Sequence, residues 1–390
     1  MDLSFSAEEL SFQREVRAFL KQNLLPSLRQ STRETTTFYP QHEVSREWHS
    51  ILYHRGWAAP HWPVERGGTG WTTSQRVIWE AECALANAPV ISPIGLSLVG
   101  PVLFRYGSLS QNAFYLPKIL SGEHVWCQGF SEPGAGSDLA SLSTRARRDG
   151  SDYVVSGSKI WTTLAQHATH MAALVRTGGG GPKQEGISFV AIDMALPGVV
   201  VRPILTMAGD HEFNQVFLDE VRVPVVNRIG EEGQGWAIAK HLLEYERGGD
   251  IASSRLRVAL NDILALHIEL SVPGDTLAAR QMVSTLAIDI DALEMMELCW
   301  IFNSNINSKR AAIPSMLKLR ASQLQQAVAE LGLQVAGGQA LRAREHNIGA
   351  AEGSKASFAA KYMNSRANTI FGGSSEIQRT LIFRQIDSPS

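Results

Sequence analysis

Three short segments of this chain combine residue types that suit the binding of a phosphate-bearing cofactor. The first, residues 130–138, reads FSEPGAGSD and is called the glycine loop here. Glycine has no side chain to obstruct a ligand, so backbone N–H groups in such a loop can approach phosphate oxygens closely. The second segment, 159–163, reads KIWTT, and the third, 371–379, reads FGGSSEIQR. A glycine loop alone is usually an ordinary turn, but the three segments together indicate a cofactor site.

Length and charge limit what the chain can do. Its 390 residues exceed a usual single core and predict two or three domains or layers. Lys and Arg number 36 against 38 Asp and Glu, which predicts no basic surface for nucleic acid and no polybasic membrane tether. We expect no signal peptide, no transit peptide and no membrane span. A soluble cytoplasmic protein is therefore expected.

Cysteine and histidine form no metal-binding or redox pattern in the sequence. Cys83, Cys127 and Cys299 are widely spaced and odd in number, so they predict neither a disulfide framework nor a CxxC site. The 11 histidines give no HExxH or similar pair of ligands. We therefore expect no bound metal and a reducing compartment.

The hydrophobic pattern predicts an α+β multidomain fold in three parts. Residues 1–122 are predicted to form an N-terminal α-helical domain, with capping boxes at 6–9 and 72–75. Short β-rich runs between turns predict a central β-sandwich or barrel domain over 123–230. These runs are 153–155, 172–175, 187–192, 199–201 and 216–218. Residues 231–390 are predicted to form a C-terminal four-helix bundle. Its long amphipathic stretches are 236–270, 277–303, 314–335 and 355–386.

In these motifs and this order of domains the chain resembles the acyl-CoA dehydrogenase flavoprotein family over nearly its whole length. The resemblance implies FAD on the β domain and α,β-desaturation of an acyl-CoA thioester. In that reaction a base removes an α-proton while the β-hydrogen leaves as hydride to flavin N5. It also implies that electrons pass to an electron-transferring flavoprotein.

The resemblance assigns roles to individual residues of this sequence. It implies that Ser131 bonds the flavin, that Trp161 packs on the isoalloxazine and that Thr163 bonds near N5. The residues expected to bind FAD are Gln128, Phe130, Ser131, Gly136, Trp161, Thr163, Gln334, Gly338, Ser374 and Glu376. Those expected on the substrate side are Ser137, Arg247 and Gly373.

The catalytic base is expected at Glu246. Many family members carry a Glu two positions before the Ser or Thr of the final motif, but Gly372 stands at that place here. A minority carry the Glu instead in the helix after the β domain, directly before an Arg, and Glu246-Arg247 matches that pattern. Two glycines, 248 and 249, follow and cost a helix about 1 kcal/mol each relative to Ala. Their presence favours close approach by substrate or flavin over an ordinary surface carboxylate.

The chain departs from the family at a loop that reaches the FAD of a neighbouring subunit. Family members carry Arg-x-x-Phe-Gly there, whereas residues 271–275 read SVPGD. This departure, with the segments at 1–5 and 55–63, resembles the large subunit of pimeloyl-CoA dehydrogenase and related heteromeric acyl-CoA dehydrogenases that degrade fatty, dicarboxylic or steroid side chains. It implies a hetero-oligomer in which a smaller related subunit supplies the arginine; otherwise a homodimer or homotetramer is expected.

Two alternatives stay open at this point. One is a catalytically silent structural subunit with a vestigial FAD site. The missing Arg-x-x-Phe-Gly loop favours this alternative, and the intact glycine loop disfavours it. The other is a flavin oxidase or monooxygenase on the same fold, which reaction of the reduced flavin with oxygen would reveal.

Overall fold

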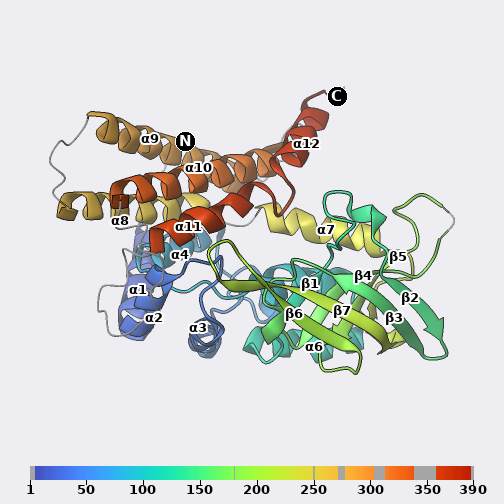
Figure 1. Ribbon diagram of the computed structural model, residues 1–390. Coiled ribbons are helices and arrows are strands. Elements are labelled where there is room, and N and C mark those ends of the chain that lie inside the picture. Colours follow the sequence, from blue (N-terminus) through green and yellow to red (C-terminus); the bar gives the residue numbers. More distant parts are fainter. Residues whose placement is uncertain are drawn as a thin grey trace, which may run out of the picture. The chain divides into compact units, whose positions relative to one another are not determined.

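The computed structural model in Figure 1 describes residues 5–179, 181–248, 251–270, 277–302, 312–337 and 357–387. For 244–248, 269–270, 277–279, 357 and 387 it describes the backbone alone. The chain divides into two compact units. Unit 1 comprises Met1–Val44, Trp71–Val90 and Gly249–Ser390, and unit 2 comprises Ser45–Gly70 and Ile91–Gly248.

Unit 1 is helical, and its N-terminal helices begin where the sequence predicts. The Ser6 hydroxyl accepts from Glu9 N–H at 3.2 Å, while the Glu9 carboxylate accepts from Ser6 N–H at 2.8 Å. Thr72 and Gln75 form the same reciprocal cap, so both predicted capping boxes are confirmed. The helices of this unit are α1 (Ala7–Asn23), α2 (Pro26–Glu34), α4 (Thr73–Leu85), α8 (Ala252–Leu270), α9 (Leu277–Phe302), α10 (Ile313–Ala336), α11 (Ser357–Ser365) and α12 (Ser375–Asp387).

The C-terminal helices of unit 1 pack around one apolar core. Leu260 of α8, Leu293 of α9 and Leu324 of α10 are buried in it, and Phe358 of α11 packs against it. The sequence pattern merged helices that the structure separates: the stretch 355–386 contains both α11 and α12. Between them Gly372 and Gly373 have φ of 62° and 87°, a left-handed conformation that ends helical periodicity.

Unit 2 is built on one sheet, which has eight strands within the described residues. The strand order is β6-β7-β3-β2-β4-β5-β8, and β1 pairs in parallel with β4. The strands are β1 (Trp126–Gly129), β2 (Arg145–Asp149), β3 (Asp152–Lys159), β4 (His170–Arg176), β5 (Ile187–Asp193), β6 (Val199–Leu205), β7 (His211–Pro224) and β8 (Arg228–Ile229).

The strands β1 and β2 are absent from the predicted set. The segment WCQG of β1 is only four residues long, and β2 reads RARRD with a single apolar side chain. The sheet forms them nevertheless, because β2 pairs antiparallel to β3 from Arg145–Ser156 to Asp149–Asp152. Tertiary pairing thus overrides a weak local pattern.

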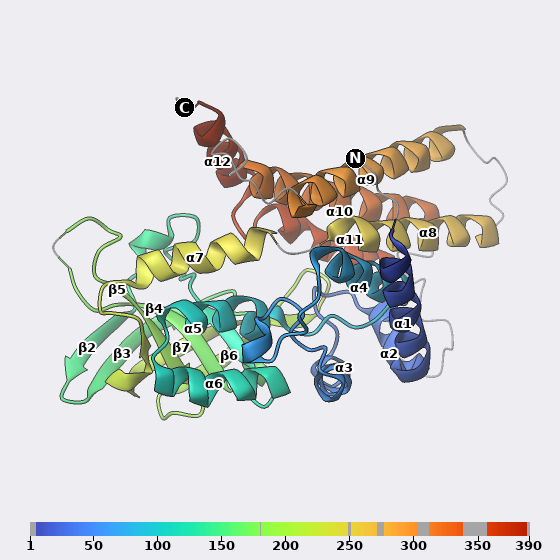
Figure 2. The same cartoon turned by 180° about the vertical axis from the view of Figure 1, so that it is seen from behind.

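Helices cover one face of this sheet. Figure 2 shows α5 (Gly100–Tyr106) and α6 (Leu109–Ser121) on it, and their residues Val102 and Ile119 share a core with Trp126 and Leu174 of the sheet. A second apolar cluster is formed by other side chains of the same sheet, among them Val155 of β3 and Val216 of β7. The other helices of unit 2 are α7 (Gly235–Gly248), most of α3 (His42–Arg55) and the π-helical η2 (Ile94–Val99).

The predicted fold class is confirmed, since helices precede a β domain and more helices follow it. The predicted boundaries after residues 122 and 230 stay predictions. Among the described residues, no helix is both long enough and apolar enough to cross a membrane.

Candidate functional site

The glycine loop follows β1 and closes in a tight turn. Glu132 N–H donates to the Ala135 carbonyl at 2.9 Å, and Ala135 N–H donates back at 3.0 Å. A Cβ atom at Gly134 or Gly136 would meet nothing within 4 Å. Within the described part of the chain, the backbone N–H groups of Gly134, Gly136 and Ser137 have no acceptor. The turn therefore presents unpaired donors on an open surface, as binding of phosphate or carbonyl oxygens requires.

A buried ion pair anchors this turn to the sheet. The Lys159 ammonium lies 2.8 Å from Glu132 Oε1, and the two side chains are 0% and 4% exposed. The Glu132 carboxylate also accepts from Ser143 N–H at 2.6 Å and Thr144 N–H at 2.9 Å. Lys159 donates in addition to the Leu174 carbonyl of β4 at 2.7 Å. With these partners the charges are hydrogen-bonded in full, which a buried pair needs to be tolerated.

The surroundings keep both members of the pair charged near neutral pH. Burial alone would raise the pKa of the Glu132 carboxyl, but the Lys159 charge and the hydrogen bonds outweigh burial and hold that pKa at about 2. Burial lowers the pKa of Lys159 to about 8, against the opposing effect of Glu132. The anchor is therefore a carboxylate and an ammonium at pH 7.

The second segment, 159–163, lies beside the glycine loop. Ile160 N–H donates to the Ser131 carbonyl at 2.9 Å, and Lys159 Nζ reaches the Phe130 carbonyl at 3.4 Å. On its other side Thr162 N–H donates to the Asn214 carbonyl of β7 at 3.0 Å. The fold thus brings together two segments that are separate in the sequence.

Trp161 adopts a backbone conformation that is uncommon for a bulky residue. Its φ is 58°, in the left-handed region. The indole is 57% exposed and makes an edge contact with Phe213 at 6.1 Å between centroids. Next to it, the Oγ1 atom of the buried Thr162 has no hydrogen-bond partner among the described residues. An exposed, conformationally strained aromatic is typical of a functional surface.

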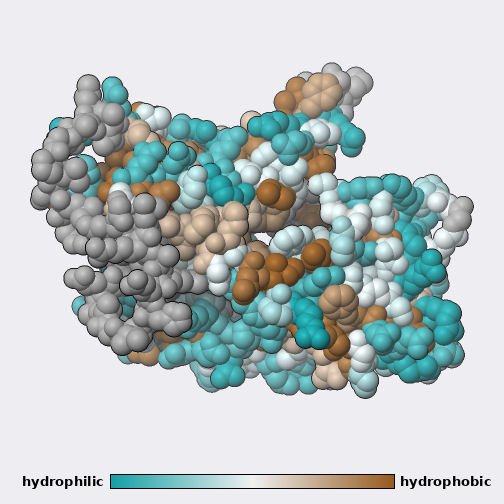
Figure 3. All heavy atoms as spheres, in the orientation of Figure 1, coloured by the Kyte–Doolittle hydropathy of each residue, from teal (hydrophilic) through white to brown (hydrophobic). Residues whose placement is uncertain are grey.

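Exposed apolar side chains also occur on the β6–β7 hairpin, whose residue Phe213 contacts Trp161. Figure 3 shows brown spheres over the β6–β7 hairpin, where exposed residues include Val200, Leu205, Met207 and Phe217. Val200 and Phe217 are cross-strand partners in the β6–β7 ladder. Soluble proteins usually cover contiguous apolar surface of this kind with a ligand or another protein surface.

Two other predicted cofactor residues of unit 2, Gln128 and Phe130, connect the start of the glycine loop to the sheet. Gln128 pairs with Ala172 of β4 in the parallel β1–β4 ladder. The Phe130 side chain is buried and packs edge-on against Phe189 at 6.1 Å. Thr163, two residues after Trp161, is half-buried.

Helix α7, which contains Glu246 and Arg247, packs closely on β5. A Cβ on Gly235 would lie 2.6 Å from the Ser188 carbonyl carbon, so only glycine allows this approach. Ile238 and Leu242 of the helix are buried in the core of unit 2. The side chains of Glu246 and Arg247 lie outside the described set, so their predicted roles stay predictions.

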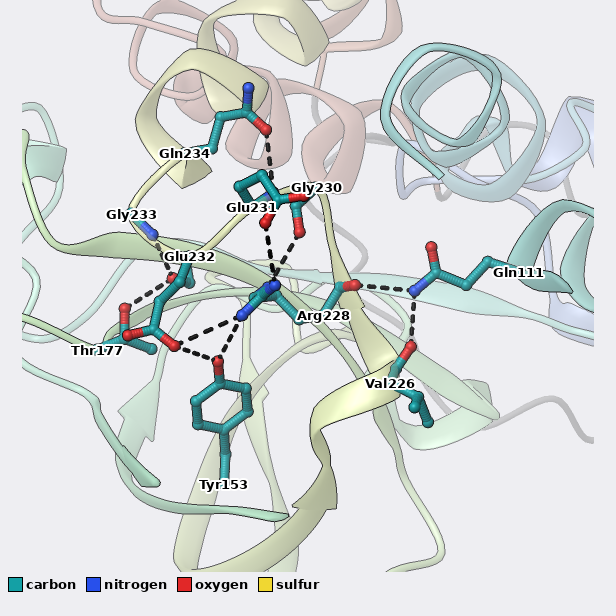
Figure 4. A network of polar contacts seen from close by, with 11 residues as sticks. Gln111, Tyr153, Thr177, Val226, Arg228, Gly230, Glu231, Glu232, Gly233 and Gln234 are labelled. Carbon is teal, nitrogen blue, oxygen red and sulfur yellow. Dashed lines mark hydrogen bonds and ion pairs between the residues drawn. The ribbon is translucent and has the colours of Figure 1, made fainter. Parts of the chain in front are cut away.

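The polar network in Figure 4 fixes the chain just before α7. Arg228 Nε donates to the Gly230 carbonyl at 3.0 Å, and its NH1 group donates to the Tyr153 hydroxyl at 3.1 Å. Tyr153 in turn donates to the Glu232 carboxylate at 2.6 Å. Since Tyr153 belongs to β3, this network ties the entry of α7 to the middle of the sheet.

Two further contacts in Figure 4 extend the network. Gly233 N–H donates to Ser188 Oγ at 2.9 Å, which joins the entry of α7 to β5. Gln111 Nε2 of α6 donates to the carbonyl oxygens of Val226 and Arg228 at 2.7 and 2.8 Å. Contacts from β3, β5 and α6 thereby hold the segment 226–233 that leads into α7.

The third segment lies in unit 1, where two side chains bind its backbone. Lys318 Nζ donates to the Gly373 carbonyl at 2.9 Å, and Gln378 Nε2 donates to the Gly372 carbonyl at 3.0 Å. Ser374 N-caps α12 through a weak bond of 3.4 Å from Ile377 N–H. Glu376 lies in the first turn of this helix, and its own backbone N–H is the main cause that lowers its carboxyl pKa.

The two residues near the end of α10 that are predicted to bind FAD, Gln334 and Gly338, are described only in part. Gln334 is exposed near the end of α10, which stops where Gly337 adopts φ of 52°. Gly338, also predicted to bind FAD, lies outside the described residues, as does the departing segment 271–275.

Two residues of this site, Glu132 and Lys159, received no role in the sequence analysis. Both stand inside the quoted motifs but 27 positions apart, so local periodicity gave no sign of their contact. The sequence did contain one signal for this ion pair, because a Glu and a Lys of opposite charge stand in two motifs that are predicted to share one site.

The comparisons with known proteins cover the chain from end to end. The family description "Acyl-CoA dehydrogenase, N-terminal domain" matches residues 6–123, the middle domain matches 127–221, and the C-terminal domain matches 233–386. The acyl-CoA dehydrogenase IpdE1 of Mycolicibacterium smegmatis is 33% identical over 97% of each chain. The chain belongs to the acyl-CoA dehydrogenase family.

Two solved structures that are similar to this chain are named after pairs of proteins. The "Tcur3481-Tcur3483 steroid ACAD" has a TM-score of 0.86 at 29% identity, with all of both chains covered. The "ChsE4-ChsE5 complex from Mycobacterium tuberculosis" has a TM-score of 0.84 at 29% identity, again over the full length of both chains. Membership of this family makes the chain an oxidoreductase acting on acyl-CoA, as the sequence predicts.

Proposed function

We propose that this acyl-CoA dehydrogenase chain is the base-bearing subunit of a heteromeric enzyme that desaturates an acyl-CoA thioester with FAD. The observation that carries the proposal is the buried Lys159–Glu132 anchor. It holds the glycine loop, with its unpaired N–H groups, beside the exposed Trp161.

The residues present fit an FAD molecule. The N–H groups of Gly134 and Gly136 offer donors on a surface with no Cβ in the way. The exposed indole of Trp161 offers an aromatic face, and the Thr162 hydroxyl is a buried polar group in need of a partner. FAD bound here supplies the redox chemistry, because it accepts the β-hydrogen of the substrate as hydride.

The FAD-binding set proposed on unit 2 is Gln128, Phe130, Ser131, Gly136, Trp161 and Thr163. On unit 1 it is Gln334, Gly338, Ser374 and Glu376. Ser137, Arg247 and Gly373 are proposed to bind the acyl-CoA.

Glu246 is proposed to remove the α-proton of the acyl thioester. Gly372 excludes a carboxylate at the place where many relatives carry it, while the network around Arg228 holds α7 firmly at its start. A general base contributes roughly 10² to 10⁴-fold to such a step, provided that it is positioned within hydrogen-bond reach of the proton. We propose that α7 supplies this positioning.

The heteromer is proposed because two of the similar structures are named as pairs of proteins and because residues 271–275 lack the Arg-x-x-Phe-Gly motif. A diphosphate is bound more strongly by a guanidinium than by neutral donors alone, so a companion chain that brings the arginine would raise FAD affinity. The electron acceptor proposed is an electron-transferring flavoprotein.

The test is purification of the chain alone and together with a related companion from its native host. We expect the pair to hold FAD, to be reduced by acyl-CoA and to pass electrons to electron-transferring flavoprotein, while the isolated chain is poor in flavin. A homo-oligomer with one tightly bound FAD per chain and full turnover would contradict the heteromer. A flavin-free, inactive pair would support a silent subunit, and rapid reaction of the reduced flavin with oxygen would support an oxidase.

A further inference from the structure

A small cavity of about 30 Å³ lies inside unit 2, away from the glycine loop and Trp161. It is bordered by α3, by η2 and the residues before it, by the end of α6 and by the start of β1. Its polar lining consists of His49, Ser92, His124 and Trp126, and Gly95 removes a side chain from its wall.

Three of these lining residues each carry a polar side-chain atom that has no hydrogen-bond partner among the described residues. They are Ser92 Oγ, His124 Nδ1 and Trp126 Nε1, and each is hidden from bulk solvent. Trp126 is only 1% exposed. A buried polar group without a partner costs about 1–3 kcal/mol, and three such groups around one cavity are uncommon in a folded protein.

The chemistry of these groups defines the ligand that would satisfy them. The indole N–H of Trp126 can only donate. His49 Nε2 lies 3.0 Å from the Leu120 carbonyl, which can only accept, so Nε2 carries the proton and Nδ1 is left as an acceptor. Burial lowers the pKa of both His49 and His124, so both rings are neutral at pH 7.

A neutral molecule that both donates and accepts hydrogen bonds matches this set. The indole N–H disfavours a cation, and the lining contains no positive charge that would retain an anion. A buried water needs about 10–15 Å³ of such space and two to four polar partners. The cavity therefore has room for up to two water molecules.

We propose that this cavity is a binding site for one or two ordered water molecules that join Trp126 of β1 to Ser92, His124 and His49. The water would link α3 and the segment before η2 to the sheet. This inference does not rest on the proposed function.

The test is a crystal structure of the full chain, in its complex where one forms, at a resolution that shows ordered solvent. We expect a solvent peak about 2.7–3.2 Å from Trp126 Nε1. A dry cavity in the wild-type protein would overturn the proposal. The wild-type crystal structure needs no variant, so it tests for the bound water even if the substitutions below prevent folding.

A pair of variants provides the control. Trp126→Phe should remove or displace the peak and lower the melting temperature, because water loses its donor. Trp62→Phe removes an indole N–H that donates directly to the Leu96 carbonyl at 2.7 Å, and it should leave the peak in place. An equal or higher melting temperature for Trp126→Phe, with unchanged solvent, would show that the indole N–H binds no water.

Discussion

Lys159 and Glu132 form an ion pair of 2.8 Å in which neither side chain is more than 4% exposed. The pair joins the end of β3 to the turn of the glycine loop. Breaking a buried pair by removing one partner costs about 3–5 kcal/mol, since the other charge stays buried without compensation. This contact therefore decides whether the loop keeps its shape.

Lys159→Met should destabilise the protein by about 3–5 kcal/mol and reduce its FAD content. The matched control is Lys183→Met, because Lys183 pairs with Asp138 of the same loop at 2.8 Å with both side chains 63% exposed. An exposed pair contributes about 0–1 kcal/mol, so the control should stay close to wild type. Urea unfolding and flavin absorbance measure both effects, and equal behaviour of the two variants would contradict the anchoring role.

Trp161→Ala should weaken FAD binding by roughly 10-fold or more, since stacking on an aromatic contributes about 0.5–1.5 kcal/mol beyond the buried area. The flavin-free chain should lose little stability, because the indole is 57% exposed. Phe114→Ala is the control, as Phe114 is an aromatic of unit 2 that is 50% exposed. Titration of the apoprotein with FAD is the measurement; unchanged affinity in Trp161→Ala would exclude the proposed contact.

Tyr153→Phe should cost about 1–2 kcal/mol of stability, since it removes the hydroxyl that joins Arg228 to Glu232. If α7 positions Glu246, the variant should also lower kcat several-fold with little change in KM. Tyr53→Phe, on the exposed surface of α3, is the control. A stability loss without any change in kcat would mean that the network supports the fold alone.

Local sequence patterns predict part of this fold. The capping boxes at Ser6 and Thr72 and the strand runs of β3, β4 and β5 were predictable, because each is a local pattern. The family resemblance assigns Ser131 and Trp161 to one cofactor, and the structure brings their segments together through the hydrogen bond from Ile160 N–H to the Ser131 carbonyl. Their contacts with FAD stay predictions.

The parts that could not be predicted depend on contacts between distant positions. The Lys159–Glu132 pair and the link from Arg228 through Tyr153 to Glu232 join residues on different strands and turns. Strand β2, with the sequence RARRD, exists because β3 pairs with it rather than because of its own apolar pattern. No periodicity in the sequence reports such pairings.

Stability should fall in mild acid because of His170. Burial, assisted by His124, lowers the pKa of His170 from 6.5 to about 4. The charged groups near it are Lys118, which also lowers the pKa, and Asp193, which raises it. Since the folded-state pKa lies below the unfolded one, the contribution of His170 is present above pH 6.5 and is lost as the pH falls toward 4.

His170→Phe should reduce the loss of stability between pH 7 and pH 5, by at most about 2 kcal/mol since the ring is partly exposed. The remaining loss belongs to other buried groups such as His124, whose pKa burial also lowers. Thermal unfolding of both proteins across this pH range is the measurement. Identical pH profiles would show that His170 does not titrate in this range.

The central claim is that Glu246 removes the α-proton, and one comparison of variants tests it most directly. Glu246→Gln and Glu244→Gln change the same functional group at neighbouring positions of α7, so both remove one negative charge. In the active assembly we expect Glu246→Gln to retain FAD and acyl-CoA binding but to lose roughly 10² to 10⁴-fold or more of the rate of flavin reduction. Glu244→Gln should remain close to wild type. Near-normal flavin reduction by Glu246→Gln would contradict the assignment.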